Sequence, residues 1–337
     1  MKIITAKKRI KIPRKVRRLR WGVAGCGNYL EKTFLPALQQ LKKSRLVSVY
    51  SSDPERAKFI AGKFAAEKSY NNYDEFLNSD FDALYISSIN SNHYEQVIKG
   101  ALAGKHILCE KPLALSSEQA RLMIKSCEEN NVLLSINYLH RFHPLVSKAK
   151  ELIKKFLLGK VVSISANFNI NFAPGNNYRF KKELSGGGAL RDIGTHMLDL
   201  LRYLGGEIDE VKGFMDNVVY KSEVEDFAAG LVKFSNGSYG SFNVTYNTPK
   251  AFNRIEVLGY KGCLSIENLI GKKFESSKLV INLDGEAKKS FRRRANKQLY
   301  LLRSVQKSFL NNEIPLITGN DGLINLQLME EFERKCL

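Results

Sequence analysis

The stretch Trp21-Gly22-Val23-Ala24-Gly25-Cys26-Gly27 decides the fold of the first part of the chain. It combines an apolar run typical of a buried strand with two glycines that directly precede helical sequence. In such a unit the first glycine makes a tight turn, the second lets the backbone approach a pyrophosphate, and the free N–H groups of the helix N-terminus face the anion. We therefore predict a dinucleotide site that includes Gly25, Cys26, Gly27, Asn28 and Tyr29.

The sequence around this loop repeats the pattern. From Arg20 to about Asn137, short apolar runs alternate with segments of helical periodicity, which is typical of βαβ units and a doubly wound parallel sheet. The expected strands cover residues 21–24, 46–50, 83–86, 106–109 and 132–136. Two helices have recognisable starts, because Asp53 precedes Pro54 and Ser116 precedes Gln119 at capping-box spacing. The first part of the chain is therefore predicted to be α/β.

After about Arg141 the sequence becomes rich in β-strand patterns. The expected strands cover residues 161–172, 211–215, 227–234, 238–245, 255–258 and 279–283, and helices are expected at about 144–156, 190–204 and 321–335. This pattern predicts an α+β domain on a large, mostly antiparallel sheet. We divide the chain into a basic extension (1–19), a dinucleotide-binding domain (20–140) and a second domain for substrate binding and oligomerisation (141–337).

The formal net charge is +19, and residues 1–20 hold ten Lys or Arg and no acid. A second basic cluster comprises Lys288, Lys289, Arg292, Arg293, Arg294 and Lys297. Basic tails can bind nucleic acid or anionic lipid head groups, but the first tail has no aromatic residue on which bases could stack. We therefore do not expect nucleic acid as a partner, and a flexible extension with no dedicated partner is the simpler interpretation.

Apolar runs and cysteines indicate the compartment. No run approaches the roughly 18 apolar residues needed to span a bilayer, so we expect no membrane insertion. The N-terminus also lacks the apolar stretch of a secretory signal. The five cysteines are scattered and form no Cys-x-x-Cys pair, so we predict neither disulfides nor a metal site. A cytoplasmic protein fits these observations best.

The residues after the second expected strand choose between two dinucleotides. An NAD site places an acid there for the ribose 2′-hydroxyl, whereas an NADP site offers hydrogen-bond donors or a cation. Ser51 and Ser52 occupy this place, and Asp53 is better explained as a helix N-cap. We therefore predict that NADP(H) is favoured, with Ser51, Ser52 and Arg56 near the 2′-phosphate, while NAD(H) stays possible.

The glycine loop departs from the dinucleotide fingerprint at one position. Leu30 stands where Gly or Ala is usual, so we expect the following helix to lie slightly farther from the sheet. A plain strand-to-helix turn is the alternative for this loop.

Glu110-Lys111-Pro112 places a charged amine directly after the buried strand at 106–109. Side chains at the carboxyl ends of strands in an open α/β sheet face the crevice in which ligands bind. A solvated surface lysine is the alternative if Lys111 is considered alone. The residue is a candidate for catalysis if a proton partner lies nearby.

A second group runs from Gly186-Gly187-Gly188 into the helix expected at 190–204. Asp192 and His196 are four residues apart, so they share one helical face, and an imidazole beside a carboxylate suits proton transfer near neutral pH. Ordinary surface or capping roles are the alternative, and a zinc site lacks a third ligand. We interpret the three glycines as allowing close backbone approach to a ligand.

With the glycine loop, Glu110-Lys111-Pro112 and the block from Gly186 to Asp199 in this order, the chain resembles the Gfo/Idh/MocA oxidoreductase family from about Arg20 onward. The resemblance implies a Rossmann domain, a C-terminal sheet domain that often supports homodimers or homotetramers, and an active site between them. It also implies that the Lys111-Pro112 bond is frequently cis, that Lys111 binds the reacting oxygen, and that His196 is the acid/base with Asp192 nearby.

We therefore expect an NAD(P)-dependent enzyme that moves a hydride to or from a hydroxyl or carbonyl carbon of a sugar, cyclitol or nucleotide sugar. His196 is the expected general acid/base, Lys111 the oxygen-binding cation, and Asp192 a group that orients substrate or histidine. The expected cofactor contacts further include Ser88, Asn90, His93, Glu110 and Lys111, and the expected substrate contacts are Lys111, Arg141, Arg179, Asp192 and His196. His106, His140 and His143 receive no role.

Two other functions stay open on sequence alone. One is a cofactor-binding regulator or nucleic-acid-associated protein that uses the basic tail. The other is an enzyme that oxidises and re-reduces its substrate with one retained cofactor.

Overall fold

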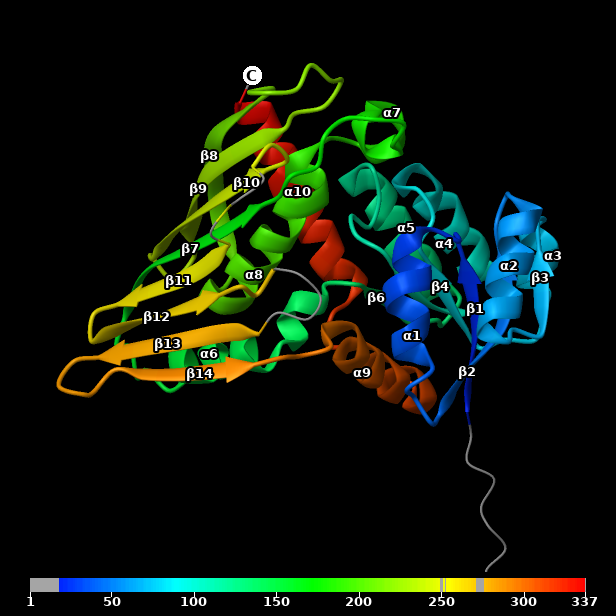
Figure 1. The fold of residues 1–337 in the computed structure, drawn as a ribbon, viewed down its shortest axis with the longest axis horizontal. Coiled ribbons are helices and arrows are strands. Elements are labelled where there is room, and N and C mark those ends of the chain that lie inside the picture. Colours follow the sequence, from blue (N-terminus) through cyan, green and yellow to red (C-terminus); the bar gives the residue numbers. More distant parts are fainter. Residues whose placement is uncertain (1–17, 249–250, 252, 271–275, 337) are drawn as a thin grey trace, which may run out of the picture.

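The computed structural model describes residues 18–248, 251, 253–270 and 276–336. The chain forms two sheet domains, with helices α9 and α10 running between them (Figure 1). The predicted basic extension falls almost wholly outside the described residues. Among the described helices, none combines the length and the apolar character needed to cross a lipid bilayer.

The first sheet is parallel throughout and has six strands in the order β3-β2-β1-β4-β5-β6. Its strands are β1 (Leu19–Ala24), β2 (Ser44–Tyr50), β3 (Lys68–Tyr70), β4 (Ala83–Ile86), β5 (His106–Cys109) and β6 (Leu134–Ile136). This is the predicted Rossmann sheet, and the order reverses at β1 and β4, whose carboxyl ends open the crevice where such sheets bind ligands. The short edge strand β3 was not predicted, because its three residues form no apolar run.

Helical segments connect these strands. They are η1 (Leu30–Phe34), α1 (Leu35–Leu38), α2 (Pro54–Phe64), α3 (Tyr73–Leu77), η2 (Asn90–Asn92), α4 (His93–Leu102), α5 (Ser117–Glu129) and η3 (Leu139–Phe142). Asp53 accepts hydrogen bonds from the N–H groups of Glu55 and Arg56, and Ser116 accepts one from Gln119 N at 3.2 Å. Both predicted helix starts are therefore confirmed.

The second sheet has eight strands in the order β14-β13-β12-β11-β7-β10-β9-β8, and all neighbours are antiparallel except β7 and β10. Its strands are β7 (Val161–Asn169), β8 (Ile208–Asp216), β9 (Phe227–Phe234), β10 (Tyr239–Thr245), β11 (Arg254–Gly259), β12 (Gly262–Glu267), β13 (Ser277–Leu283) and β14 (Lys289–Arg293). The mostly antiparallel sheet is as predicted. Strands β12 and β14 were missed, and β14 is exposed along its whole length.

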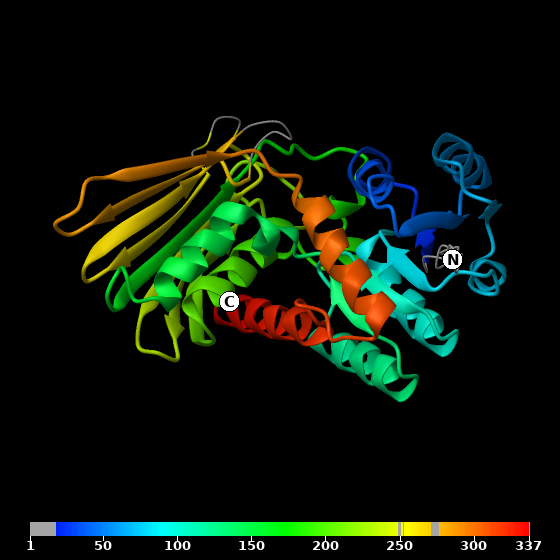
Figure 2. The ribbon, with the colours of Figure 1, turned by 90° about the horizontal axis from the view of Figure 1, so that it is seen from below.

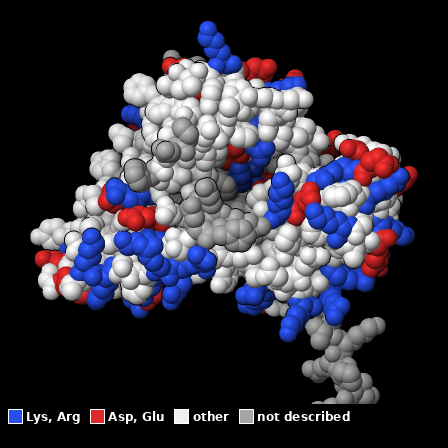
Figure 3. All heavy atoms as spheres, viewed as in Figure 1, with Lys and Arg blue, Asp and Glu red and all other residues white. Residues whose placement is uncertain are grey.

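Helices cover one face of this sheet. They are α6 (Pro144–Lys154), α8 (Thr195–Gly205) and α10 (Gly319–Lys335), and the short segments η4 (Tyr178–Phe180), α7 (Lys182–Ser185) and η5 (Leu190–Gly194) lead into α8. Figure 2 shows these three helices on the same side of the strands. The opposite face exposes apolar side chains, among them Phe214 and Leu231. Figure 3 shows Lys and Arg side chains gathered over the outer edge of the sheet near β14.

Helix α9 (Lys297–Asn311) was not predicted, and it returns the chain to the first domain. Leu299, Leu302 and Val305 pack into the apolar cluster that contains Trp21, and the ring centroids of Trp21 and Phe309 are 6.1 Å apart. A segment of the range assigned to the second domain therefore completes the core of the first.

Candidate active site

The glycine loop joins β1 to η1, and its two glycines have different surroundings. Gly25 adopts φ +90°, and a Cβ on it would lie 2.4 Å from the backbone nitrogen of Ser88. A Cβ on Gly27 would meet no atom within 4 Å. Gly25 is therefore required by the neighbouring chain, whereas Gly27 leaves open space in front of the helix start. Leu30, at the unusual third position, is completely buried in the apolar cluster.

The residues after β2 lie beside this loop. Arg56 donates from Nε to the carbonyl oxygen of Cys26 at 2.8 Å, and its guanidinium pairs with Glu31. Lys63 reaches the other oxygen of Glu31 at 2.6 Å, and together Lys63 and Arg56 lower the pKa of Glu31 to about 2. Ser51 is buried and Ser52 is exposed. The fold thus brings Arg56 to the glycine loop, but its guanidinium already has protein partners.

Three predicted cofactor contacts follow β4, namely Ser88, Asn90 and His93, and their side chains form hydrogen bonds with neighbouring segments. Ser88 Oγ donates to Gln96 Oε1 at 2.6 Å, and Asn90 Nδ2 donates to the Ser185 carbonyl at 2.9 Å. The ring of His93 is buried and donates from Nδ1 to the Pro112 carbonyl at 3.0 Å. Burial lowers the pKa of His93 to about 4, so the ring is neutral at neutral pH. These contacts position the loop that carries Lys111.

Lys111 lies at the carboxyl end of β5, and its peptide bond to Pro112 is cis, as the resemblance implied. Its ammonium group donates to the carboxylate of Asp192 at 2.5 Å and to the Asp192 carbonyl at 2.6 Å. The lysine and the aspartate predicted from separate motifs therefore meet. Their side chains are 13% and 16% exposed, so the pair is enclosed but still reachable.

Glu110 faces the other way, into the first domain. Its carboxylate accepts hydrogen bonds from Tyr85 OH at 2.5 Å and from the side-chain amide of Asn137. Burial raises the pKa of Glu110, and these donors offset part of that effect. Asn137 also donates to Gln298 Oε1 at 3.1 Å, and Tyr29 OH donates to the same oxygen at 2.8 Å. Glu110 thus anchors the turn before Lys111, and α9 supports it.

Asp192 gathers three donors around one carboxylate. Besides Lys111, the hydroxyl of Tyr246 donates at 2.8 Å and Arg179 Nε lies at 3.3 Å. Burial alone would raise the pKa of Asp192, but Lys111 and Arg179 outweigh it and hold the pKa below its usual value. Asp192 is therefore ionised, and the two cations leave one positive charge over.

His196 lies one turn beyond Asp192, where the π-helical turn η5 passes into α8. The side chain is buried, and its ring centroid is 4.7 Å from that of His140 with the rings nearly perpendicular. Burial and then the charge of Lys111 lower the pKa of His196 well below its usual value. Among the described residues, Nδ1 has no hydrogen-bond partner and no hydrogen bond joins His196 to Asp192. The carboxylate therefore orients Lys111 rather than the imidazole.

One of the three glycines, Gly188, has a structural explanation within the chain. A Cβ on Gly188 would lie 2.0 Å from the carbonyl oxygen of Glu225. The Glu225 carboxylate accepts hydrogen bonds from Gly188 N and Leu190 N, each at 2.9 Å, and so caps the start of η5. The close approach is thus made by the chain itself.

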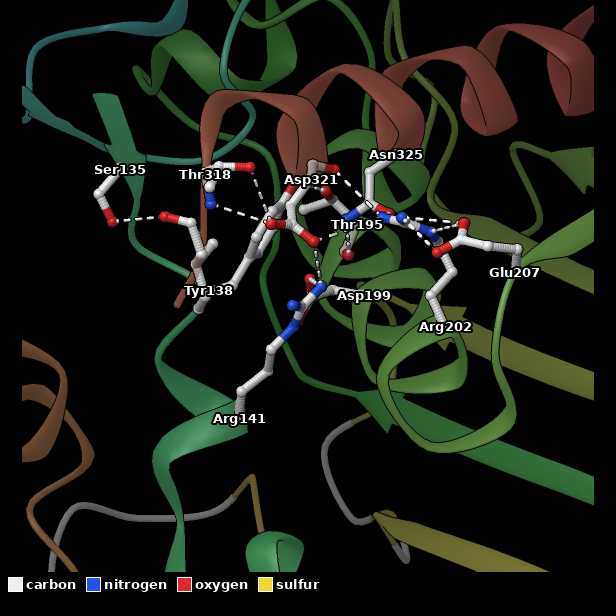
Figure 4. Close-up of polar contacts among 11 residues, drawn as sticks. Ser135, Tyr138, Arg141, Thr195, Asp199, Arg202, Glu207, Thr318, Asp321 and Asn325 are labelled. Atoms are coloured by element: carbon white, nitrogen blue, oxygen red, sulfur yellow. Dashed lines mark hydrogen bonds and ion pairs between the residues drawn. The ribbon is translucent and has the colours of Figure 1, made fainter. Parts of the chain in front are cut away.

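Arg141, predicted as a substrate contact, lies in a buried ionic cluster (Figure 4). Its guanidinium donates to both oxygens of Asp199, at 3.0 and 2.6 Å, and to Asp321 at 2.9 Å. On the far side of this cluster Arg202 pairs with Glu207. Because its donors are committed to α8 and α10, Arg141 joins these helices to η3, and we assign it a structural role.

Sequence reasoning missed four side chains in this region: Tyr246, Gln298, Lys297 and His140. Tyr246 follows β10 with no motif around it, and Gln298 and Lys297 belong to the unpredicted helix α9. Within the described part of the chain, no group of three His, Cys, Asp or Glu side chains could hold a metal ion.

Comparison with known proteins adds a second line of evidence. Residues 19–138 match an oxidoreductase family described as having an NAD-binding Rossmann fold, and residues 146–265 match the GFO/IDH/MocA C-terminal domain. The 1,5-anhydro-D-fructose reductase of Ensifer adhaerens is 28% identical over 311 residues, covering 91% of this chain and 93% of the reductase.

Two further proteins are similar over most of their length. The D-xylose 1-dehydrogenase (NADP(+)) 2 of Haloferax volcanii is 29% identical over 232 residues, covering 68% of this chain and 70% of the dehydrogenase. The crystal structure of an aldose-aldose oxidoreductase from Caulobacter crescentus, complexed with glycerol, matches with a TM-score of 0.87 at 27% identity and covers 95% of this chain and 98% of that one.

Proposed function

Because the chain belongs to the Gfo/Idh/MocA family of NAD-binding oxidoreductases, we propose that it transfers a hydride between a nicotinamide and a CH–OH or C=O carbon of a sugar, cyclitol or nucleotide sugar. The convergence of Lys111, Asp192, Arg179 and the buried His196 at the carboxyl edge of the first sheet carries this proposal. The alternative of a regulator that uses the basic tail is not favoured, because such a protein would need none of these four residues.

The glycine loop fits a pyrophosphate. The open space before Gly27 is where a ligand can approach the backbone, and η1 begins directly behind it. Cys26, Gly27, Asn28 and Tyr29 would hold the cofactor there. The bound nicotinamide supplies a carbon that accepts or donates the hydride.

Lys111 is the proposed binding group for the reacting oxygen. This oxygen gains negative charge as its carbon–hydrogen bond is broken or formed, and an ammonium group in an enclosed site stabilises that charge. The two hydrogen bonds to Asp192 fix the position of the ammonium group in advance. The second cation, Arg179, keeps the site net positive and lies where it can bind a neighbouring substrate hydroxyl.

His196 is the proposed general acid/base. Its ring is neutral because burial and the charge of Lys111 disfavour the imidazolium form, so it can accept the hydroxyl proton during oxidation. In the reverse direction it returns a proton to the oxygen. Only a neutral imidazole can accept the hydroxyl proton, and the positive charge of Lys111 helps to keep the ring neutral.

We test this function with an absorbance screen of sugars against both nicotinamides, including D-xylose with the oxidised forms and 1,5-anhydro-D-fructose with the reduced forms. Turnover should fall about 100-fold or more in both Lys111→Met and His196→Asn, while cofactor affinity changes little. Lys125→Met, an exposed lysine of α5, is the control. Near-normal turnover in both active-site variants would refute the assignment.

NADP(H) is the proposed preference. No acid occupies positions 51 and 52, and Asp53 is committed to the N–H groups of Glu55 and Arg56. Arg56 already contacts the glycine loop, and a 2′-phosphate would compete with Glu31 for its guanidinium. Fluorescence titration should show that Arg56→Ala weakens NADPH binding more than NADH binding, whereas Lys58→Ala on the same helix changes neither. Tighter NADH than NADPH binding by the unaltered protein would refute the preference.

We also propose that the uncovered face of the second sheet joins two copies of this chain as a homodimer or homotetramer. Phe214 is 80% exposed and Leu231 68% exposed on this face, which no described helix covers. Leu231→Asp should reduce the mass measured by light scattering, whereas Leu102→Asp, an equally exposed leucine of α4, should not. An unaltered protein that is monomeric at micromolar concentration would contradict this proposal.

A cytoplasmic location is the proposed compartment. The five cysteines are all free, which fits a reducing environment. Fractionation of cells that make the protein would test it, and recovery from a secreted or membrane fraction would contradict it.

A further inference from the structure

A lysine outside the motifs approaches the catalytic histidine through a second histidine. Lys297 is the first residue of α9, and its ammonium group donates to Nδ1 of His140 at 3.2 Å and to the Leu269 carbonyl at 2.7 Å. His140 comes from η3, and its ring is packed at right angles to that of His196, with 4.7 Å between centroids. Three helical segments that are far apart in sequence therefore meet in one contact chain.

The placement of Lys297 is locally unfavourable. The positive end of the helix dipole lies at the first turn of α9, where a cation is disfavoured. Burial of the ammonium group adds to this, and it lowers the pKa of Lys297 to about 8. No carboxylate among the described residues pairs with Lys297. Because both effects are unfavourable for the ammonium group, helix stability does not explain the position of Lys297.

The direction of the hydrogen bond fixes the chemistry of His140. An ammonium group can only donate, so His140 Nδ1 must accept, and the ring proton of the neutral imidazole then lies on Nε2. His196 has no such partner on Nδ1 among the described residues. Its protonation state therefore depends on the charges and rings around it rather than on a direct hydrogen bond of its own.

Charged and titratable groups face these rings from every side. Lys111 approaches His196 from the loop after β5, Asp192 from η5, His140 from η3 and Lys297 from α9, while His143 faces Lys297 from the start of α6. Burial is the main cause that lowers the pKa of His140, His143 and His196, and the charge of Lys297 lowers each of them further. At His196 the charge of Lys111 has a larger effect than that of Lys297, and Asp192 acts in the opposite sense.

We propose that Lys297 and His140 are positioning residues for His196: Lys297 holds His140 in its Nε2–H tautomer, and its positive charge disfavours protonation of the neighbouring His196 ring. The inference rests on the proposed function, because it takes His196 as the acid/base. When Lys297 loses its proton, the free-energy cost of protonating the His196 ring falls. Lys297 therefore acts on His196 through His140 as a second titrating group near the site.

The test needs no substrate. The five histidines are labelled with ¹⁵N and ¹³C in their rings, assigned by His→Asn variants, and followed by NMR from pH 5 to 9.5 in the full chain. We expect His140 to show the Nε2–H tautomer and an inflection near pH 8 as Lys297 titrates. Unchanged His140 shifts across that range in the unaltered protein would overturn the proposal without any variant.

Two variants separate charge from structure. Lys297→Met removes the donor and the charge, so His140 should become a mixture of tautomers and the pKa of His196 should rise. Lys297→Arg keeps both, so it should restore the tautomer and the low pKa while losing the inflection. Lys307→Met, an exposed lysine of the same helix, should change nothing. A methionine variant with the tautomer and pKa of the unaltered protein would refute the proposal.

Kinetics with a substrate found in the screen separates this failure from failure of the proposed function. The limb of the pH profile that reports His196 should move to higher pH in Lys297→Met and stay in place in Lys297→Arg. If that limb survives in His196→Asn, the acid/base assignment itself is wrong. If it vanishes there but does not move in Lys297→Met, only the role of Lys297 is wrong.

Discussion

Asp192 and Asp199 lie seven residues apart on one continuous helical segment, and arginine contacts each of them, yet their surroundings differ. The side chain of Asp192 is 16% exposed, and its partner Arg179 is 33% exposed. The side chain of Asp199 is 1% exposed, and its partner Arg141 is 7% exposed. The first carboxylate is partly exposed, whereas the second is sealed between helices (Figure 4).

The balance of charge separates the two regions more clearly than burial does. Two cations, Lys111 and Arg179, surround the single carboxylate of Asp192, so the site has a positive charge left for an incoming oxygen. Around the buried Asp199, Arg141 and Arg202 face three acids, which are Asp199, the partly exposed Asp321 and the largely exposed Glu207. A cluster with no spare positive charge holds the fold together, and a cluster with one to spare can bind a ligand.

The largest effect should come from breaking the sealed cluster. Arg141→Met leaves the buried carboxylate of Asp199 without its partner and removes one contact of the partly exposed Asp321, which should cost about 3–5 kcal/mol of unfolding free energy. Urea denaturation measures the loss, and Arg121→Met on the exposed face of α5 is the control. A loss of less than 1 kcal/mol would mean that the two regions do not differ as described.

Replacing Asp199 tests the difference between the two regions through the pH dependence of the unfolding free energy. Burial raises the pKa of Asp199 to about 6 from 3.8, although Arg141 opposes the shift, so this group binds a proton more tightly in the folded state. Its contribution to stability is therefore greatest below pH 4 and is lost as pH rises to 6, by at most about 3 kcal/mol. In Asp199→Asn this loss should vanish, and denaturation at several pH values measures it. If the unfolding free energy of Asp199→Asn fell between pH 4 and 6 as steeply as that of the unaltered protein, Asp199 would not be the group responsible.

The open site should respond in rate rather than in stability. Lys111→Met should lower kcat about 100-fold, which corresponds to about 2.7 kcal/mol, because the cation at the reacting oxygen is lost. The melting temperature should change little, since Arg179 and Tyr246 still contact Asp192. Steady-state kinetics and thermal melts measure both. A large loss of stability with kcat preserved would reverse the comparison.

The smallest effect should come from conservative exchange of the two arginines. Arg141 donates two hydrogen bonds to Asp199 and one to Asp321, a geometry that lysine cannot reproduce, so Arg141→Lys should lower the melting temperature measurably. Arg179→Lys should leave the melting temperature unchanged and raise KM a few-fold. Equal melting temperatures for the two variants would remove the distinction.

The sequence predicted the parts of the site that depend on local rules. Strand ends singled out Lys111 and helical spacing singled out Asp192 and His196, whereas only the family resemblance predicted that the two groups meet. Tyr246 and His140 reach the site through tertiary packing that no local pattern encodes. Arg141 shows the reverse error, because its residue type alone does not reveal that three acceptors in other helices already bind it.

Helix α9 was missed although its sequence contains a signal. Asn296 caps it, and Leu299, Leu302 and Val305 have helical spacing. The basic residues from Lys288 to Lys297 were interpreted as a charge cluster, and the helix that begins at Lys297 was overlooked. Nothing in that pattern says which sheet the helix covers, because its apolar face could pack against either one.

The position of α9 also has a consequence for how the protein is made. The first domain reaches its last strand at Ile136, but Trp21 stays without its neighbour Phe309 until α9 has left the ribosome. A domain normally folds as soon as its own segment has been synthesised. Here part of the apolar surface of the Rossmann sheet stays uncovered until residues 297–311 have been synthesised.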